Sequence, residues 1–376
     1  MNITKIIINN FRNHDHSEIQ LSDGINVFVG KNGSGKTSIL EAITVLSLSK
    51  SFLPVSDSSL IQAQLNFYRI ELNAKNSLDS DYKVKIVYER GGRKQISSTY
   101  GENLNPKDII GEVPIVVLSP DYKAITFGSP EDRREFLDKI LSQSSRLYID
   151  HILNLKKSLK QRNNLLNQYK LHKTLDRNQF EIWTEFFINN AVEVYLRRNE
   201  FIKSFTPIFE SYYKIIASDK ETVSLEYQPN GISTENLCNQ DKNMIKENLI
   251  NYFHKISDDE MRRGTTLFGP QKDDIKILVN RRSAKDSASQ GQHKSLLISL
   301  KFGEFEYLKE IKNETPVVLL DDIFAELDLE RSAKVIDILR SSNTQTFITI
   351  TDTNILKSIE NNSELSYFWV EDGRVS

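Results

Sequence analysis

The chain has 376 residues, of which 27% are charged and 39% hydrophobic, and its formal net charge is −2. A chain of this length suggests roughly two or three domains with ample material for a core. The net charge is too small for the whole molecule to attract polyanions, so nucleic-acid binding would need local basic patches or a ligand that switches it on. The single cysteine, Cys238, cannot form an internal disulfide, and the absence of Cys/His clusters with metal-ligand spacing argues against structural zinc.

The N-terminal sequence has no basic segment followed by an apolar run of signal-peptide length. No stretch of the sequence approaches the apolar length of a membrane span. We therefore expect a cytoplasmic protein that does not bind a membrane.

The first part of the chain, up to about residue 125, predicts short β-strands around a phosphate-binding loop. Segments 67–72 and 82–88 have the composition of strands, and Gly91-Gly92 is a turn signal. The apolar run at 25–29 predicts a buried strand, and 38–46 predicts a helix. Between these two lies the full Walker A pattern, Gly30-Lys31-Asn32-Gly33-Ser34-Gly35-Lys36-Thr37.

This loop predicts ATP and Mg²⁺ as cofactors. Glycines let backbone N–H groups surround phosphates, Lys36 reaches the β and γ oxygens, and the Thr37 hydroxyl ligates Mg²⁺. The N-terminus of the following helix would face the phosphates and add to their attraction. The alternative, a glycine turn that binds no nucleotide, would not need such a helix. The predicted nucleotide contacts are Gly30, Lys31, Asn32, Gly33, Ser34, Gly35, Lys36, Thr37 and Ser38.

Helical periodicity begins after Pro130 and indicates an insertion. Two antiparallel helices in a short coiled-coil arm explain it, and so do two helices of a globular all-α subdomain, because periodicity alone does not separate them. A strand at 223–227 and a helix at 242–256 follow, and strand texture returns from Arg263. We expect a discontinuous α/β head at 1–127 and 263–376, with an inserted helical arm at 128–262. The apolar heptad positions are Ile152, Leu155, Leu159, Leu166 and Tyr169, then Phe180, Phe187, Val194, Phe201 and Ile208, with Arg162 at one of the first series.

The segment before a helix predicted at 294–303 offers a second anion site. Ser289-Gln290-Gly291-Gln292 combines a serine hydroxyl, glycine backbone N–H groups and a helix dipole, and these four residues are predicted nucleotide contacts as well. Taken alone, this segment is explained better by an ordinary helix N-cap than by an anion site.

An apolar run after Thr315 predicts a buried parallel strand that ends in Asp321 and Asp322. At such a strand end Asp321 is placed to hold Mg²⁺ through water, and Asp322 to polarise the attacking water. The predicted metal ligands are therefore Thr37 and Asp321, and the predicted catalytic residues are Asp322, Lys36 and Ser289.

Walker A, the serine-glycine-glutamine helix start and the distal aspartates together resemble the ABC-type ATPase head. In that family two heads enclose two ATP molecules, and each signature serine contacts the γ-phosphate held by the partner. The resemblance implies an ATP-dependent homodimer. Ala325-Glu-Leu-Asp328 matches the D-loop order, whereas threonines end strand 346–351 where transporters have a histidine, and Asp322 replaces a glutamate.

Further strings make the resemblance narrower, and the chain is similar to the RecF family of bacterial recombination mediators. Two positions depart from the family pattern: Gln271 stands where histidine is usual, and Leu53 where arginine is frequent. The matching strings are Phe11-Arg-Asn-His14 (family "FRNY"), Leu118-Ser-Pro-Asp-Tyr122, Gly128 to Asp138, Lys156 to Leu166 (family "LKQRN.LL") and Gly269-Pro-Gln-Lys-Asp-Asp274 (family "GPHRDD").

The resemblance implies a weak, DNA-stimulated ATPase that dimerises with ATP on gapped or single-strand/double-strand junction DNA. It also implies RecR and RecO as partners and help in loading RecA. A transporter ATPase subunit is the first alternative, but it would need a switch histidine and no heptad insertion. A structural DNA tether of SMC type is the second, but helices of about 40 residues, roughly 60 Å, are too short for it.

Local basic clusters would neutralise DNA phosphates once two subunits align, or they are simply solvated surface. Arg262, Arg263 and Lys285 also belong to such clusters. The predicted DNA-binding residues are Lys156, Lys157, Lys160, Arg162, Arg197, Arg198, Arg281 and Arg282.

Overall fold

The structure is a computed structural model that describes residues 1–217, 220–238, 241–351 and 365–376. It divides into two compact units, and we treat each separately. Unit 1 comprises Met1–Lys123, Ser211–Lys220 and Gln290–Ser376, and unit 2 comprises Ala124–Glu210 and Glu221–Ser289.

This division differs from the expected ranges in three places. Residues 124–127 and 263–289 group with the helical unit, and 211–220 group with the unit that carries the Walker A loop. The last of these differences arises inside helix α6 (Arg177–Ile216), which is continuous across it, so the sequence pattern contains no break at that point. The assignment of a head at 1–127 and 263–376 and an arm at 128–262 stays a prediction.

Unit 1 contains a six-stranded sheet with the order β15-β14-β3-β13-β12-β8, in which all pairs are parallel except β14 with β15. Strands β3, β12 and β13 are apolar runs buried along their whole length, as expected for parallel strands covered on both faces. The bounds are β3 Ile25–Val29, β8 Ile115–Leu118, β12 Val317–Asp321, β13 Thr346–Ile350, β14 Leu365–Glu371 and β15 Arg374–Val375.

A second, antiparallel sheet of unit 1 has the order β2-β1-β4-β5-β6-β7. Its strands alternate in burial, since one face covers the core and the other faces water. Helix α1 (Lys36–Leu48) contacts strands of both sheets and is buried along most of its length. The strands are β1 Asn2–Phe11, β2 His14–Gln20, β4 Phe67–Lys75, β5 Asp81–Glu89, β6 Gln95–Ser98 and β7 Gly101–Leu104.

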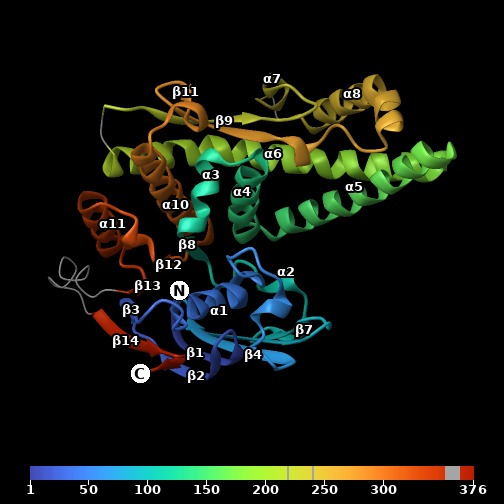
Figure 1. Cartoon of the computed structure of the whole chain (residues 1–376). Coiled ribbons are helices and arrows are strands. Elements are labelled where there is room, and N and C mark those ends of the chain that lie inside the picture. The colour runs from blue at the N-terminus through green and yellow to red at the C-terminus, as the bar shows by residue number, and fades with distance from the viewer. Residues whose placement is uncertain (218–219, 239–240, 352–364) are drawn as a thin grey trace. The chain divides into compact units, whose positions relative to one another are not determined.

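Three further helices and three short 3-10 turns lie in the described part of unit 1, and α10 packs beside β8. Figure 1 shows the N- and C-terminal strands, blue and red, next to each other in this unit, and β15 contacts β2. The additional helices are α2 Pro106–Ile109, α10 Gln290–Lys312 and α11 Leu329–Ser342, with short 3-10 turns at Asp57–Leu60, Pro120–Lys123 and Ile323–Ala325.

Unit 2 is a mixed helical unit around two long antiparallel helices, α5 and the first part of α6 (Figure 1). Helix α8 packs against α5, and a three-stranded antiparallel sheet, β11-β10-β9, completes the unit, so the helix pair does not stand alone. The elements are α3 Ala124–Phe127, α4 Pro130–Ser144, α5 Arg146–His172, β9 Val223–Gln228, α7 Thr234–Cys238, α8 Lys242–Arg263, the turn Pro270–Lys272, β10 Asp274–Val279, β11 Arg282–Ser283 and α9 Ala284–Ser287.

Arg162 is fully buried where α5, α6 and α8 meet. Its guanidinium forms an ion pair with Glu260 at 2.9 Å and donates hydrogen bonds to Thr184 and Thr266. Four aromatic rings surround it within 5.1–5.5 Å, from Phe180, Phe187, Phe253 and Phe268. The expectation that Arg162 contacts DNA is therefore corrected, because its charge is neutralised and enclosed inside unit 2.

Replacing Glu260 with alanine should destabilise unit 2 by about 3–5 kcal/mol, because it leaves the Arg162 charge buried without a counter-ion. The measurement is urea unfolding followed by circular dichroism. The matched control is Glu185→Ala, which removes a largely exposed partner of Lys246 and should cost less than about 1 kcal/mol. Equal losses for the two variants would contradict this view of the pair.

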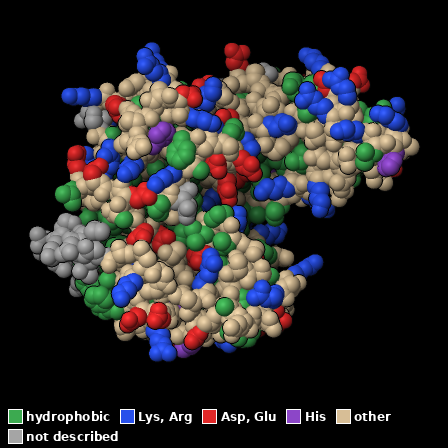
Figure 2. Space-filling model, in the orientation of Figure 1, with side chains coloured by type: hydrophobic (Ala, Val, Ile, Leu, Met, Phe, Trp, Pro, Cys, Tyr) green, Lys and Arg blue, Asp and Glu red, His purple; other side chains and the backbone are tan. Residues whose placement is uncertain are grey.

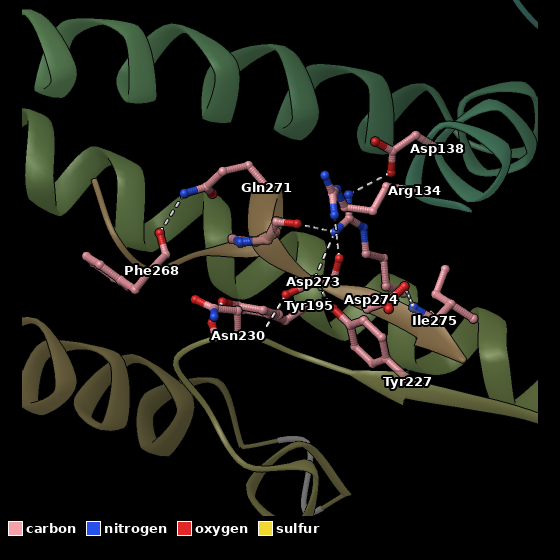
Figure 3. A network of polar contacts seen from close by, with 12 residues as sticks. Arg134, Asp138, Tyr195, Tyr227, Asn230, Phe268, Gln271, Asp273, Asp274 and Ile275 are labelled. Carbon is pink, nitrogen blue, oxygen red and sulfur yellow. Dashed lines mark hydrogen bonds and ion pairs between the residues drawn. The ribbon is translucent and has the colours of Figure 1, made fainter. Parts of the chain in front are cut away.

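A second buried network fixes the segment Gly269–Asp274 against α6 (Figure 3). Asp273 accepts hydrogen bonds from Tyr227, from the Asn230 N–H and from Arg198, which also pairs with Asp138 at 2.8 Å. Burial raises the pKa of Asp273 to about 6, and the Arg198 charge and the hydrogen bonds act against that rise. Arg198 is only 2% exposed, so the expectation that it contacts DNA is corrected as well.

Candidate nucleotide-binding site

The Walker A loop leaves β3 and enters α1, as the strand–loop–helix pattern predicts. Gly33 and Gly35 have φ values of 80° and 114°, in the region that favours glycine. A Cβ atom at Gly35 would lie 2.7 Å from the His14 ring, and one at Gly30 would lie 2.2 Å from the Val370 carbonyl. The loop is thus packed closely from outside, and only glycine fits at these positions.

A cavity of about 500 Å³ opens in front of the loop, within unit 1. Of the predicted contacts it gathers those from Asn32 to Ser38 except Ser34, together with Asp322. Gly30, Lys31 and Ser34 are not among its lining residues. The cavity lining is Arg12, Asn13, Asn32, Gly33, Gly35, Lys36, Thr37, Ser38, Glu41, Leu53, Ser59, Ile61 and Asp322.

The Lys36 ammonium lies on the loop itself, 2.8 Å from the Gly30 carbonyl oxygen and 2.9 Å from that of Lys31. Burial lowers its pKa, while the charges of Asp322 and Asp321 raise it. Hydrogen bonds between two charged groups are stronger than those to neutral carbonyls. Phosphate oxygens would therefore draw the ammonium away from these carbonyls.

The predicted metal ligands lie in direct contact. The Thr37 hydroxyl donates to Asp321 Oδ1 at 2.8 Å, which joins the start of α1 to the end of β12. Burial raises the pKa of Asp321, and hydrogen bonds from Thr37 and Thr349 lower it. A hydroxyl and a carboxylate are hard oxygen ligands, so this pair fits Mg²⁺.

Thr349 has a role that the sequence did not reveal. Its hydroxyl donates to Asp321 Oδ1 at 2.9 Å and accepts the Asp322 N–H at 2.9 Å. Strand β13, which carries it, lies between β3 and β12 in the sheet. In the sequence, the threonines at this strand end stand out only as a departure from the histidine of transporters. The neighbouring segment from residue 352 to 364 lies outside the described residues.

Asp322 is the first residue after β12 and lines the cavity. Its φ of 51° lies in the left-handed region, which aspartate enters more readily than most residues. Side chains held in such conformations cluster at functional sites. Its place at the cavity wall suits the predicted role of polarising an attacking water.

The serine-glycine-glutamine segment does not line this cavity. Ser289 and Gln290 are exposed at the start of α10. The first turns of this helix are tied to the segment after Walker B, since Lys294 donates to the Glu326 carbonyl and Arg331 Nε to the Ser295 hydroxyl. The catalytic role predicted for Ser289 stays a prediction.

The N-terminal string that carried the family resemblance contributes directly to the site. Arg12 makes a two-point ion pair with Glu41 at 2.8–2.9 Å, and Ser51 donates to the same carboxylate. Leu53, where the family frequently has arginine, lines the cavity beside them. The string Phe11-Arg-Asn-His14 was the only sequence signal for this part of the site, and it did not predict these contacts.

The remaining predicted DNA contacts are on the surface of unit 2. Lys156, Lys157 and Lys160 are exposed on α5, Arg197 is partly exposed on α6, and Arg281 and Arg282 are exposed at the turn between β10 and β11. Figure 2 shows Lys and Arg side chains over the end of unit 2 that α5 and α8 form, with acidic side chains among them.

Across the described residues, no group of His, Cys, Asp and Glu side chains is arranged as a metal site, and no helix has the length and apolarity to span a membrane.

Comparison with known proteins decides the family. The model of the RecF/RecN/SMC N-terminal domain matches residues 2–373. A protein of Chloroherpeton thalassium named DNA replication and repair protein RecF is 36% identical over 353 residues, which cover 94% of this chain and 95% of that protein. The chain belongs to the RecF family. A RecF of an Exiguobacterium species is 32% identical and covers 100% of the chain and 99% of its own length.

Solved structures agree with this family. A structure described as the recombination mediator RecF with ATP, in the RecFOR pathway, matches with a TM-score of 0.90 and 27% identity over 100% of this chain and 97% of that one. An Smc head domain from Pyrococcus furiosus matches with a TM-score of 0.56 and 16% identity, which shows the fold alone. The predicted RecF resemblance and the α/β ATPase head of ABC/SMC type are confirmed.

Proposed function

We propose that the chain is an ATP-dependent DNA-binding ATPase of recombination and repair, which dimerises on gapped or junction DNA when it binds ATP. The observation that carries the proposal is the cavity in front of the Walker A loop, where Lys36, Thr37 and Asp322 converge. Thr37, at the cavity wall, contacts Asp321 behind it. A P-loop hydroxyl beside a strand-end aspartate is the arrangement that suits a nucleotide-bound Mg²⁺. RecF proteins solved with ATP have the same fold.

The residues divide the chemistry among themselves. Lys36 would hold the β and γ phosphate oxygens, and loop N–H groups would surround them. Thr37 and Asp321 would hold Mg²⁺, which supplies neutralising charge to the phosphates when bound. Asp322 would orient the attacking water and accept its proton. Ser289 would act on the ATP of the opposite subunit, so that hydrolysis requires the dimer.

DNA contact would follow dimerisation. The net charge of −2 gives a single subunit little attraction for DNA. Lys156, Lys157, Lys160, Arg197, Arg281 and Arg282 remain candidates, because their side chains reach solvent on unit 2. Phosphate contacts of this kind carry affinity without sequence preference, which suits a protein that recognises the structure of DNA and not its sequence. In this proposal, DNA bound in this way stimulates a weak ATPase.

A related structure described as part of the RecFOR pathway supports RecO and RecR as partners. Help in loading RecA, in the cytoplasm, belongs to the same proposal. The ATPase of a transporter or a DNA tether remains the alternative reading. Stimulation of hydrolysis by linear duplex DNA excludes the transporter, because a transporter subunit should not respond to DNA, and the shortness of the helical arm argues against the tether.

Asp322→Asn should bind ATP but hydrolyse it at least about 100-fold more slowly, because the amide keeps the shape of the side chain but cannot accept a proton. Thr37 and Asp321 are unchanged in this variant. Sedimentation with ATP and a gapped duplex should then show a long-lived dimer on DNA, whereas wild type should return to its starting state as ATP is consumed.

The matched control is Asp337→Asn, which changes an exposed acid on α11 that does not line the cavity. If Asp322→Asn turns over near the wild-type rate, another residue positions the water. If ATP leaves the sedimentation of both proteins unchanged with DNA, the proposed ATP-driven dimerisation is wrong.

A further inference from the structure

Three consecutive carbonyl groups of the Walker A loop are hydrogen-bonded from outside the loop. The Asn13 amide donates to the Gly33 oxygen at 3.2 Å, and the Gly373 N–H donates to the Ser34 oxygen at 2.8 Å. His14 Nε2 lies 3.0 Å from the Gly35 oxygen. The β1–β2 turn and the β14–β15 turn thus hold the loop together from its back.

This attachment orients the donors that face a nucleotide. In a trans peptide the C=O and the following N–H point in opposite directions. With the Gly35 oxygen held by His14, the Lys36 N–H points away from His14, and Lys36 is the first residue of α1, so this N–H has no partner within the helix. His14 therefore fixes the direction of an N–H that is placed to bind phosphate.

The hydrogen bonds around His14 depend on its protonation. Because the Gly35 carbonyl can only accept, Nε2 must carry a proton in every state. In the neutral ring Nδ1 must accept the Ser17 hydroxyl proton over their 2.9 Å contact. In the charged ring Nδ1 donates to Ser17 instead, and the hydroxyl is released to donate to the Gly373 oxygen, 3.2 Å away. Protonation thus links both turns through one chain of hydrogen bonds.

We propose that His14 is a positioning residue of the nucleotide site, and that its protonation tightens the Walker A loop and raises the affinity for ATP. The inference rests on the proposed function, since it assigns regulation to the same site. In the charged state the bond to the Gly35 oxygen is charge-assisted, and the loop is tied to the C-terminal turn at one more point.

The surroundings of His14 set the pH range. It is fully buried, and burial lowers its pKa below the ordinary 6.5, against hydrogen bonds to Gly35 and Gly373 and the charge of Asp15, which raise it. Of the groups on the packed elements, Lys36 directs its ammonium to the Gly30 and Lys31 carbonyls, and Asp372 adjoins Gly373 in the C-terminal turn. The ring is therefore mainly neutral at pH 7, and its charged form becomes the main one only below pH 6.5.

The test compares ATP affinity of the full chain by calorimetric titration with Mg²⁺ at pH 7.5, 6.5 and 5.5. His14→Gln offers one donor to Gly35 and one acceptor to Ser17 at every pH, but it cannot be charged. Between the highest and the lowest pH, the affinity of wild type relative to His14→Gln should rise about fivefold, because a charge-assisted bond replaces a neutral one. Protonation of ATP itself cancels in this ratio. His16→Gln is the matched control, since His16 lies on the same strand but is exposed.

Identical pH profiles for wild type and His14→Gln overturn the inference. Should His14→Gln fail to fold, Ser17→Ala replaces it: removing the acceptor of Nδ1 disfavours the charged ring, so the pH response should weaken, and an unchanged response also overturns it. Lys36→Ala distinguishes failure of the proposed nucleotide site from failure of the role of His14. If that variant binds ATP like wild type, the proposed site is wrong; if it loses binding while His14→Gln titrates like wild type, only the role of His14 is wrong.

Discussion

Lys36→Ala should abolish tight ATP binding, with a loss of at least about 100-fold in affinity, because it removes the ammonium that would hold the β and γ phosphates. The side chain is 5% exposed and directed at the loop, so it is already in the site before nucleotide arrives. DNA binding that requires ATP should be lost with it. Lys36→Met should give the same result, since it keeps the bulk and removes the charge.

Lys31→Ala is the matched control for this experiment. Lys31 is a predicted nucleotide contact of the same loop through its backbone N–H, which alanine keeps, whereas its side chain is exposed and it contacts Lys36 through its backbone carbonyl. An equilibrium titration should therefore give near wild-type affinity for Lys31→Ala. Unchanged affinity in Lys36→Ala would refute the assignment of the Walker A loop as the nucleotide site.

The sequence predicts best where a local pattern and its chemistry coincide. Strand β3, the loop and α1 are adjacent in the chain, so their order alone places Lys36 and Thr37 at a helix N-terminus. The contact between Thr37 and Asp321 spans most of the chain; the Walker A loop and the acid-terminated strand predicted both residues as Mg²⁺ ligands, but not the direct hydrogen bond between them. Parallel strands end at one edge of a sheet, and that geometry brings distant motifs together.

Contacts that depend on the order of strands could not be predicted. Thr349 reaches Asp321 because β13 is inserted between β3 and β12. His14 reaches the Walker A loop because the β1–β2 turn packs behind it. Neither residue has a local pattern that announces a role in a nucleotide site.

Basic clusters were the least reliable signal, because charge in a sequence does not report burial. Arg162 occupies a core position of the heptad series, and an arginine there must be enclosed and paired. Its position in that series was visible in the sequence and favoured the structural role over DNA contact. Arg198 also lies on an apolar helix face, four residues after Val194 and three before Phe201, but its partner Asp273 is distant along the chain and could not be predicted.

Ser289→Arg is the sharpest test of the proposed dimer. In a sandwich of two heads the serine would work on the ATP held by the other subunit, so a bulky cation should block closure and reduce ATPase activity at least about tenfold. Each monomer should still bind ATP, because Ser289 does not line the cavity of its own subunit. Titration and steady-state hydrolysis measure the two effects separately, and Ser287→Arg, at an exposed position nearby, is the control.

Mixing Ser289→Arg with Lys36→Ala turns this into a test of action in trans. A heterodimer of the two contains one composite site with both lesions and one with neither, so partial activity should reappear although each variant alone is inactive. Cross-linking must show that heterodimers form. If they form and no activity returns, either the sites do not act in trans or both must be intact for hydrolysis. If Ser289→Arg alone leaves dimerisation and hydrolysis at wild-type levels, the segment Ser289–Gln292 has only the structural role of starting α10.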